Sequence, residues 1–201
     1  MQKIITQEEK ERRKKRNQLV IGIVLIWLMV VSTLGYAFID RTGANSNNSN
    51  NEKIEYNGIE FIRDENFYWK FKIQETDFLT KHNPQETEDI TFSGSKQIAE
   101  YRNKPMYFAG ENGEHVLEIA RNLNGIVLRT SNACLENDKE CSQDNENFPI
   151  KKCSNENIIV FKESVNENKI YQEENCIFIE TNYANQARYA DKFLFSILGI
   201  Q

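Results

Sequence analysis

The longest apolar stretch of the chain, Leu19–Ile39, contains 21 residues and no charged side chain. At about 1.5 Å rise per residue, a helix of this length spans the roughly 30 Å hydrocarbon core of a bilayer. Basic residues crowd its N-terminal side, whereas Arg41 follows it beside Asp40. The positive-inside bias therefore predicts a single-pass transmembrane helix at 19–39, a cytoplasmic basic tail at 1–18 and an extracytoplasmic remainder, with the protein located in the cell membrane.

The same stretch leaves open whether the apolar segment is cleaved. Gly35 and Ala37 provide small residues at a spacing that suits a signal peptidase. Signal peptides, however, have apolar cores of about 7–15 residues, and this stretch is longer. The length favours an uncleaved signal-anchor over a cleaved export signal.

Residues 40–53 form a polar segment rich in Asn and Ser, which is typical of a linker. The segment contains the single Asn-x-Ser/Thr match of the chain, which begins at Asn47. Asn47 is therefore a candidate glycosylation site in an extracytoplasmic setting. The remaining residues, 54–201, are enough for one extracytoplasmic domain with its own core.

The first part of this domain alternates apolar and polar residues, as β-strands do. In Ile54–Ile62, Asn57 and Gly58 separate two short alternating runs, which is the strongest short signal for a hairpin because both turn positions favour a positive φ. Phe67–Ile73 alternates aromatic or aliphatic side chains with lysines, a pattern typical of a half-buried strand. The domain is therefore predicted to open with an antiparallel meander.

Helical spacing appears in the middle of the domain. Ser93–Tyr101 is predicted to form a short helix capped by a serine, and Met106–Ala109 a strand after Pro105. Gly113–Gly125 has apolar residues at helical spacing and a final glycine typical of a helix stop, and Ile126–Arg129 follows as a strand. These three elements predict a β-α-β unit with parallel strands.

The last third of the chain predicts three strands and a helix. The strands are expected at Ile158–Lys162, Lys169–Tyr171 and Cys176–Glu180, and the helix at Tyr183–Leu198 has one apolar face. The predicted fold class is therefore α+β: an N-terminal transmembrane helix, a linker, and one mixed-sheet domain with a meander, one β-α-β unit and a C-terminal helix.

The net charge changes sign after the apolar stretch. Residues 1–41 carry eight Lys/Arg and four Asp/Glu, whereas residues 42–201 carry 17 and 26. Affinity for nucleic acid rests on basic side chains that neutralise phosphates, so the acidic outer part argues against a nucleic-acid partner. The expected partners are the lipid bilayer and an envelope protein or polymer, and the sequence does not predict an oligomeric state.

All four cysteines, Cys134, Cys141, Cys153 and Cys176, fall in the predicted extracytoplasmic domain. An even number of cysteines in an oxidising compartment is typical of disulfides. Four cysteines allow three pairings, and the sequence alone does not choose among them. We favour Cys134–Cys141, which closes a polar loop, together with Cys153–Cys176, which joins two neighbouring strands. No Cys-x-x-Cys pair is present, so neither a zinc site nor a redox pair is expected.

Candidate catalytic patterns are few. Ser93 and Lys96 match the Ser-x-x-Lys of penicillin-interacting enzymes, in which a lysine one helical turn away accepts the serine proton, but no Lys-Thr-Gly accompanies them. His82 and His115 are the only histidines, and no spacing selects a serine and an acid to complete a triad. We therefore assign no catalytic residue, and enzymatic activity is not the favoured interpretation.

Acidic clusters offer oxygen ligands at Glu86–Asp89, Glu136–Glu146 and Glu173–Glu174. A calcium loop needs oxygens at alternate positions and a glycine for its turn, and Glu136–Glu146 contains no glycine. The chain also has no glycine-rich phosphate loop. We therefore assign no metal ligand and no cofactor-binding residue.

The overall order of segments resembles that of pilins, with a basic leader, an apolar helix and a β-rich head that carries C-terminal cystines. The resemblance implies a filament subunit that assembles through the apolar helix after cleavage between Asn17 and Gln18. The chain departs from the pilin pattern where Asn17 replaces the processing glycine and a valine replaces the glutamate early in the mature helix.

A second resemblance covers more of the domain. The segments Asn155–Ser164 and Lys169–Glu180, followed by Ala187–Ile200, resemble the C-terminal part of uncharacterised single-pass envelope proteins of archaea, which implies an anchored, disulfide-bearing domain without a known activity. The expected function is therefore a membrane-anchored extracytoplasmic binding or structural component of the cell envelope. A pilin-like filament subunit and a membrane-tethered envelope enzyme are the alternatives.

Overall fold

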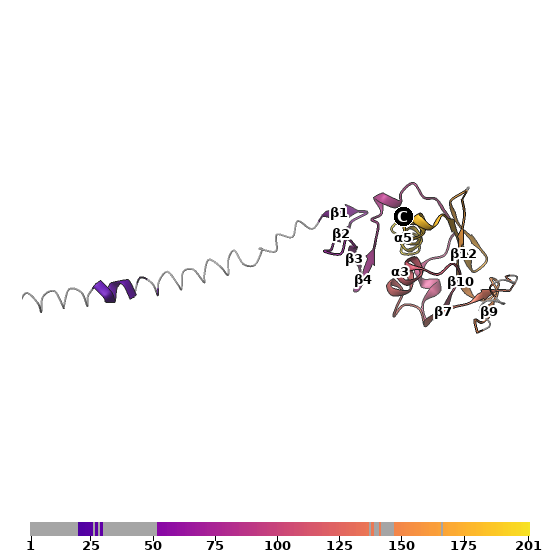
Figure 1. The fold of residues 1–201 in the computed structure, drawn as a ribbon, viewed down its shortest axis with the longest axis horizontal. Helices are drawn as coiled ribbons and strands as arrows, with labels where there is room; N and C mark the ends of the chain where they lie inside the picture. Colours follow the sequence, from indigo (N-terminus) through magenta and orange to yellow (C-terminus); the bar gives the residue numbers. More distant parts are fainter. Residues whose placement is uncertain are drawn as a thin grey trace, which may run out of the picture. The chain divides into compact units, whose positions relative to one another are not determined.

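A computed structural model describes residues 20–25, 27, 29, 52–136, 138, 141, 147–165 and 167–201. The chain divides into two units after Asn50 (Figure 1). In the first unit, the described residues are helical. Among the residues described, no helix is long and apolar enough to cross a bilayer. Most of the predicted span at 19–39 lies outside the described residues, as do the predicted tail at 1–18 and Asn47.

The second unit opens with an antiparallel sheet of four strands in chain order. These strands are β1 (Lys53–Tyr56), β2 (Ile59–Arg63), β3 (Trp69–Ile73) and β4 (Thr76–Thr80). The predicted hairpin is confirmed, because Asn57 and Gly58 form its turn with φ angles of 49° and 78°. The sequence pattern does not predict β4, because the residues of this strand do not alternate regularly between apolar and polar. The strand forms because Phe78 stacks on Phe71 of β3, with 5.4 Å between the ring centroids.

A second sheet is mixed, with the strand order β5-β11-β12-β10-β6-β7. Its strands are β5 (Phe92–Ser93), β6 (Pro105–Gly110), β7 (Arg129–Asn132), β10 (Asn157–Glu163), β11 (Lys169–Glu173) and β12 (Cys176–Thr181). Strands β7, β6, β10 and β12 are parallel, whereas β11 is antiparallel to β12 and parallel to β5. A short parallel pair, β8 (Cys134–Leu135) and β9 (Ile150–Lys151), lies outside this sheet.

The predicted β-α-β unit is confirmed as β6, α3 (Glu114–Asn122) and β7. Its second strand begins at Arg129, where the predicted strand was expected to end. The amides of Ile126 and Val127 instead donate to the carbonyl of Leu123 and close the turn after α3. Residues 126 and 127 therefore form a turn, although their apolar side chains are typical of a strand.

The helix predicted at Ser93–Tyr101 is wrong in its first half. Only α2 (Ile98–Tyr101) is helical, and its N-cap is Gln97 in a capping box with Glu100 rather than a serine. Ser93 belongs to β5, and the amides of Ser95 and Lys96, two and three residues further on, donate to Gln172 Oε1 at 2.9 and 3.2 Å. Contacts with β11 therefore keep this segment out of the helix.

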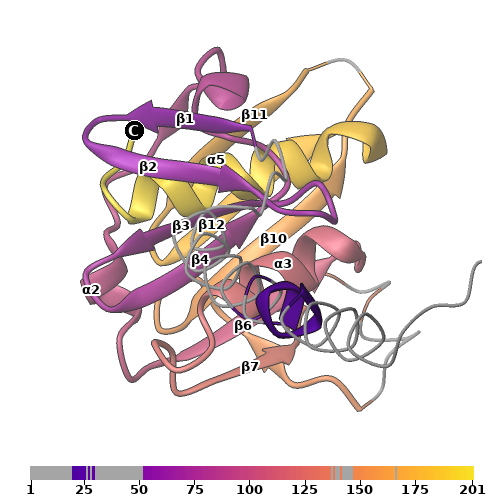
Figure 2. The ribbon, with the colours of Figure 1, turned by 90° about the vertical axis from the view of Figure 1, so that its left-hand side faces the viewer.

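The predicted C-terminal helix is confirmed as α5 (Gln186–Ile197), which follows the 3-10 turn η3 (Tyr183–Asn185). A second 3-10 turn, η2 (Gln85–Thr87), lies near it. Nine residues of α5 are buried. In Figures 1 and 2, α5 lies between the meander of β1–β4 and the strands β10 and β12 of the mixed sheet. The fold is thus α+β, with mixed and antiparallel sheets and a C-terminal helix.

Three apolar clusters build the core. The first joins α3 and α5 to one face of the mixed sheet through Phe108, Ile119, Ile159, Ile177, Phe193 and Leu194, among others. The second covers the opposite face, with Tyr107, Ile158, Val160, Cys176 and Phe178. The third packs the meander on the C-terminal part of the chain through Phe61, Trp69, Phe71, Phe78, Phe195 and Ile200. Both faces of the central strands are therefore covered, which explains their nearly continuous apolar sequences.

Side chains of α3 hold the free edge of β4. Asn122 accepts a hydrogen bond from the amide of Leu79 and donates one to its carbonyl, each at 2.7 Å. One turn earlier, Glu118 Oε1 accepts from the amide of Lys81 at 2.8 Å. These bonds supply the partners that a neighbouring strand would otherwise provide, and they fix the meander to the helical layer.

We predict that Asn122→Ala lowers the free energy of unfolding by about 1–2 kcal/mol, because the part-buried amide of Leu79 loses its acceptor and its carbonyl keeps only the longer bond from Arg121. Urea denaturation measures this loss. The matched control is Asn124→Ala, since Asn124 is exposed just beyond the same helix. Equal stability of the two variants would contradict a clamping role for Asn122.

Candidate functional site

The four cysteines form two disulfides in the favoured pairing. Cys134 at the start of β8 bonds to Cys141, with 5.6 Å between the Cα atoms. Cys153 bonds to Cys176, with a Cα separation of 5.0 Å. Cys153 lies in a turn before β10, so this disulfide joins a turn to the first residue of β12 rather than two strands.

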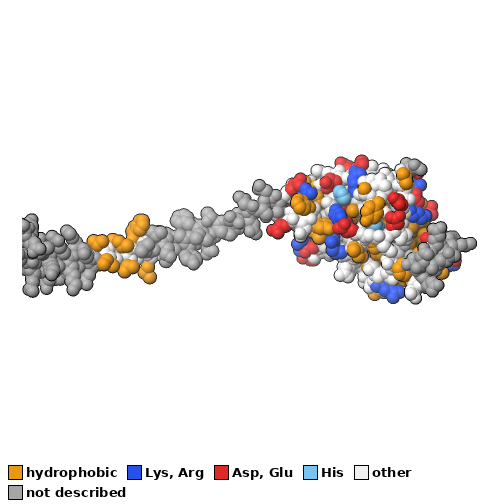
Figure 3. Space-filling view, in the orientation of Figure 1, with side chains coloured by type: hydrophobic (Ala, Val, Ile, Leu, Met, Phe, Trp, Pro, Cys, Tyr) orange, Lys and Arg blue, Asp and Glu red, His pale blue; other side chains and the backbone are white. Residues whose placement is uncertain are grey.

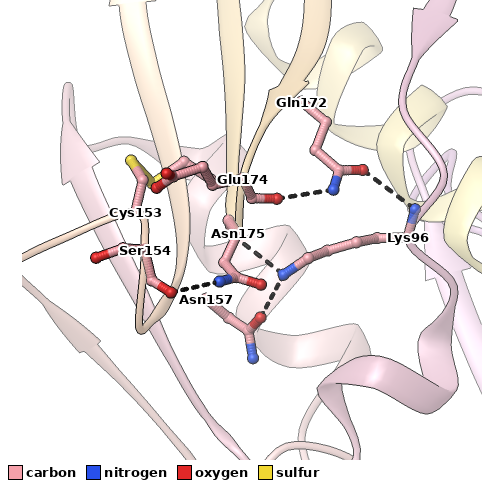
Figure 4. Close-up of a disulfide and its surroundings, with 8 residues drawn as sticks. Lys96, Cys153, Ser154, Asn157, Gln172, Glu174 and Asn175 are labelled. Carbon is pink, nitrogen blue, oxygen red and sulfur yellow. Dashed lines mark hydrogen bonds between the residues drawn. A yellow bond between two sulfur atoms is a disulfide. The ribbon is translucent and has the colours of Figure 1, made fainter.

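Ser93 and Lys96 do not form a catalytic pair. Ser93 lies in a strand, and Lys96 extends its side chain toward the turn beside the Cys153–Cys176 disulfide (Figure 4). The Lys96 ammonium donates to Asn157 Oδ1 at 2.5 Å and to the carbonyl of Asn175 at 3.2 Å. In the described part of the chain, it has no hydrogen bond to a serine. The amine is therefore not placed to accept a serine proton.

The segment around Lys96 forms one wall of a cavity of about 580 Å³. Residues between Ile90 and Gln97 line this wall, and Lys192 and Ser196 of α5 line the other, together with Gln201. Cavities of this size are typical of small-molecule sites. A second cavity of about 440 Å³ differs in character, because glutamates and lysines line it together. The first cavity has lysines in its lining and no acidic residue.

Two nearly buried lysines determine the electrostatics of the first cavity. Lys96 is 4% exposed and Lys192 is 8% exposed. The Lys192 ammonium donates to Gln201 Oε1 at 2.9 Å, and Ser196 donates to the carbonyl of Lys192 rather than to its amine. Neither ammonium forms an ion pair with any described carboxylate. Burial lowers the pKa of both lysines, and the nearby charge of Glu100 partly offsets this effect at Lys96.

A second polar centre lies where the helices meet the end of β4. Asp191 of α5 is fully buried, and its Oδ2 accepts from the amide of His82 and lies 2.9 Å from His82 Nδ1. Burial lowers the pKa of His82, so the neutral imidazole is favoured. Neutral His82 with its proton on Nδ1 satisfies the contact with Asp191 and leaves Nε2 free to accept.

Glu118 of α3 completes this centre as a neighbour of Asp191. Burial, followed by the charge of Asp191, raises the pKa of Glu118 to about 8, and burial also raises the pKa of Asp191. One buried oxygen of each carboxyl group, Glu118 Oε2 and Asp191 Oδ1, has no donor among the described residues. A proton shared between the two carboxyl groups supplies a donor and removes one buried charge.

The other candidate residues from the sequence pack in the core or form hydrogen bonds that stabilise local structure. His115 is buried against Phe161, with 4.2 Å between the ring centroids, and its Nε2 lies 3.3 Å from the carbonyl of Glu111. Glu86 accepts from the amide of Asn83. No described residues form a group of three or more His, Cys, Asp or Glu side chains that could hold a metal ion. Most of Glu136–Glu146 lies outside the described residues.

The sequence indicates His82 and Lys96 as candidates but not the other charged groups of the two polar centres. Lys192, Glu118 and Asp191 lie on helices whose apolar periodicity indicated only a packing role. Nothing in their local sequence distinguishes them from exposed charges, because their burial depends on contacts between elements that are far apart in the chain. Lys96 and Lys192, for example, line one cavity only because the segment that includes β5 packs beside α5.

Comparisons with protein-family models, with curated proteins and with solved structures find no match to this chain. The cavity, the disulfides and the sequence are therefore the features that bear on function.

We predict that the protein becomes less stable as the pH rises from about 6.5 to about 8, because below about 6.5 the lowered pKa values of His82 and His115 change the stability in the opposite direction. In this window the folded protein retains a proton on Glu118 that the unfolded chain has released, so rising pH favours unfolding. The maximum slope is about 1.4 kcal/mol per pH unit for one proton. Urea denaturation at several pH values measures it.

Glu118→Gln tests the assignment of this proton. Glutamine resembles the protonated acid, so the variant should show a shallower loss of stability between the same pH values. The control is Glu88→Gln, since Glu88 is exposed. A Glu118→Gln profile parallel to that of the unmodified protein would show that the carboxyl pair does not hold the proton.

We predict that loss of Cys153–Cys176 destabilises the domain more than loss of Cys134–Cys141. The first disulfide closes a separation of 23 residues and the second one of 7. Loop-closure entropy then gives about 3 and about 2 kcal/mol, respectively. Denaturation of the two double Cys→Ser variants measures the difference, and a larger loss for the Cys134/Cys141 variant would contradict the prediction.

Proposed function

We propose that this protein is a membrane-anchored extracytoplasmic binding component of the cell envelope. The single observation that carries the binding role is the cavity between residues 90–97 and α5, which brings two buried lysines to a space large enough for a small molecule. A purely structural component needs no such cavity, and burial of uncompensated charge is costly to the fold.

The disulfides support the extracytoplasmic part of the proposal. Disulfides persist in oxidising compartments and are rare in the cytosol. All four cysteines are paired, and no free cysteine is found in the chain. The apolar stretch Leu19–Ile39 and the basic residues before it support the membrane anchor and its orientation.

The surface of the domain also suits a water-exposed location. On the face drawn in Figure 3, acidic and basic side chains are interspersed with small apolar areas. Exposed ion pairs such as Lys53–Glu60 and Lys72–Glu75 contribute to this surface. Such pairs add little stability, but mixed charges favour solubility.

A membrane-tethered enzyme is the second candidate, and the His82–Asp191 contact is the observation that favours it. A buried carboxylate that orients a partly exposed imidazole is the usual arrangement of a general base. No serine or cysteine hydrogen-bonds to His82 among the described residues, and Asp191 also fixes the backbone of the same residue. We therefore place the function at the cavity.

Protease treatment of intact cells that express the full chain tests the location. External protease should degrade the disulfide-bearing domain while a cytosolic marker stays intact, and the full chain should remain with the membrane after an alkaline wash. Protection of the domain until the cells are lysed would contradict the proposed orientation. Release by the alkaline wash would contradict the anchor.

A further inference from the structure

The lysines of the cavity have unused hydrogen-bonding capacity. An ammonium group has three donors, and Lys192 uses one of them on Gln201 within the described residues. Lys96 uses two, on Asn157 and Asn175. The acceptors are neutral amide oxygens, which satisfy hydrogen bonds but do not cancel the charge. The lining therefore carries two positive charges, and the ammonium of Lys192 has spare donors.

The surrounding acids do not neutralise this charge directly. Glu88 and Asp89 lie close enough to favour the charged form of Lys192, but neither forms an ion pair with it. Asp89 pairs instead with Arg188, and Glu100 serves the cap of α2. Within the residues described, no carboxylate lines the cavity. A buried charge of this kind is stabilised when an anion binds beside it.

The rest of the lining limits the shape of such an anion. Ile90 and Phe92 provide an apolar wall, and Ser95 provides a hydroxyl that has no hydrogen-bond partner among the described residues. A ligand that combines one anionic group with a small apolar body matches both kinds of surface. A cavity of about 580 Å³ has room for such a molecule and for ordered water.

We propose that this cavity binds a small organic acid anion, with the anionic group at Lys192 and the apolar body against Ile90 and Phe92. The inference rests on the proposed function, because it names the ligand class of the same cavity. Lys96 contributes its charge from deeper in the fold, where Asn157 and Asn175 fix it. Substitution of Lys192 should therefore weaken ligand binding without disturbing the contacts that fix Lys96 in the fold.

The test is isothermal titration of the full chain in detergent with four probes. Benzoate carries the anionic group and an apolar body, acetate lacks the larger body, benzamide lacks the charge, and inorganic phosphate is an oxyanion without an apolar part. We expect benzoate to bind about tenfold or more tightly than benzamide, and more tightly than acetate or phosphate.

Two lysine variants provide the matched comparison. Lys192→Gln removes the charge but keeps a donor for Gln201, and it should weaken benzoate binding about tenfold or more. Lys70→Gln removes the same charge from an exposed position on β3 and should leave the affinity unchanged. Thermal midpoints of both variants that are no lower than that of the unmodified protein, measured without ligand, show that loss of folding does not account for the difference.

Four results would overturn the inference. Benzamide and benzoate could bind with equal affinity, or Lys192→Gln could leave the benzoate affinity unchanged. Phosphate could bind while benzoate does not, or none of the four probes could bind. These titrations use purified protein, so they do not depend on the membrane location. A negative result in the protease test, in turn, would contradict the proposed location but not the proposed ligand class.

Discussion

The burial of α5 on two sides is the constraint on which the rest of the domain depends. Phe193, Leu194 and Ile197 pack toward the mixed sheet, whereas Phe195 joins the aromatic cluster of the meander. A helix buried in this way has little surface left for polar residues, so each polar group on it needs a partner within the fold. The buried polar residues of α5 therefore mark the positions where the domain forms specific polar contacts.

Two consecutive residues of α5 illustrate this point. Asp191 and Lys192 are about 100° apart around the helix, so their side chains reach different neighbours. Asp191 meets His82 and the carboxyl group of Glu118, and together with Asn122 this centre attaches the end of the meander to the helices. Burial raises the pKa values of both carboxyl groups and favours a proton on the pair, whereas the backbone amides that donate to the two groups lower these pKa values.

Lys192 lies on the other side, at the cavity, where its charge has no carboxylate partner among the described residues. Lys96 reaches the same region from the segment between β5 and α2, and its ammonium is fixed beside the Cys153–Cys176 disulfide (Figure 4). The disulfide, the turn that it joins and the lysine thus form one connected unit. In this unit the buried ammonium of Lys96 is held by neutral oxygen acceptors of Asn157 and Asn175.

The sequence by itself determined the features that depend on neighbouring residues. Asn57 and Gly58 specify the first hairpin through their backbone preferences, and the apolar periodicity specifies α3 and α5. The structure then selected one of the three possible pairings of the four cysteines. Only the tertiary structure decided that Ser93 joins a strand and that Glu118, Asp191 and Lys192 are buried. Sheet pairing and burial arise from contacts between distant segments, and a charged residue on an amphipathic helix has the same local sequence pattern whether water or another element covers it.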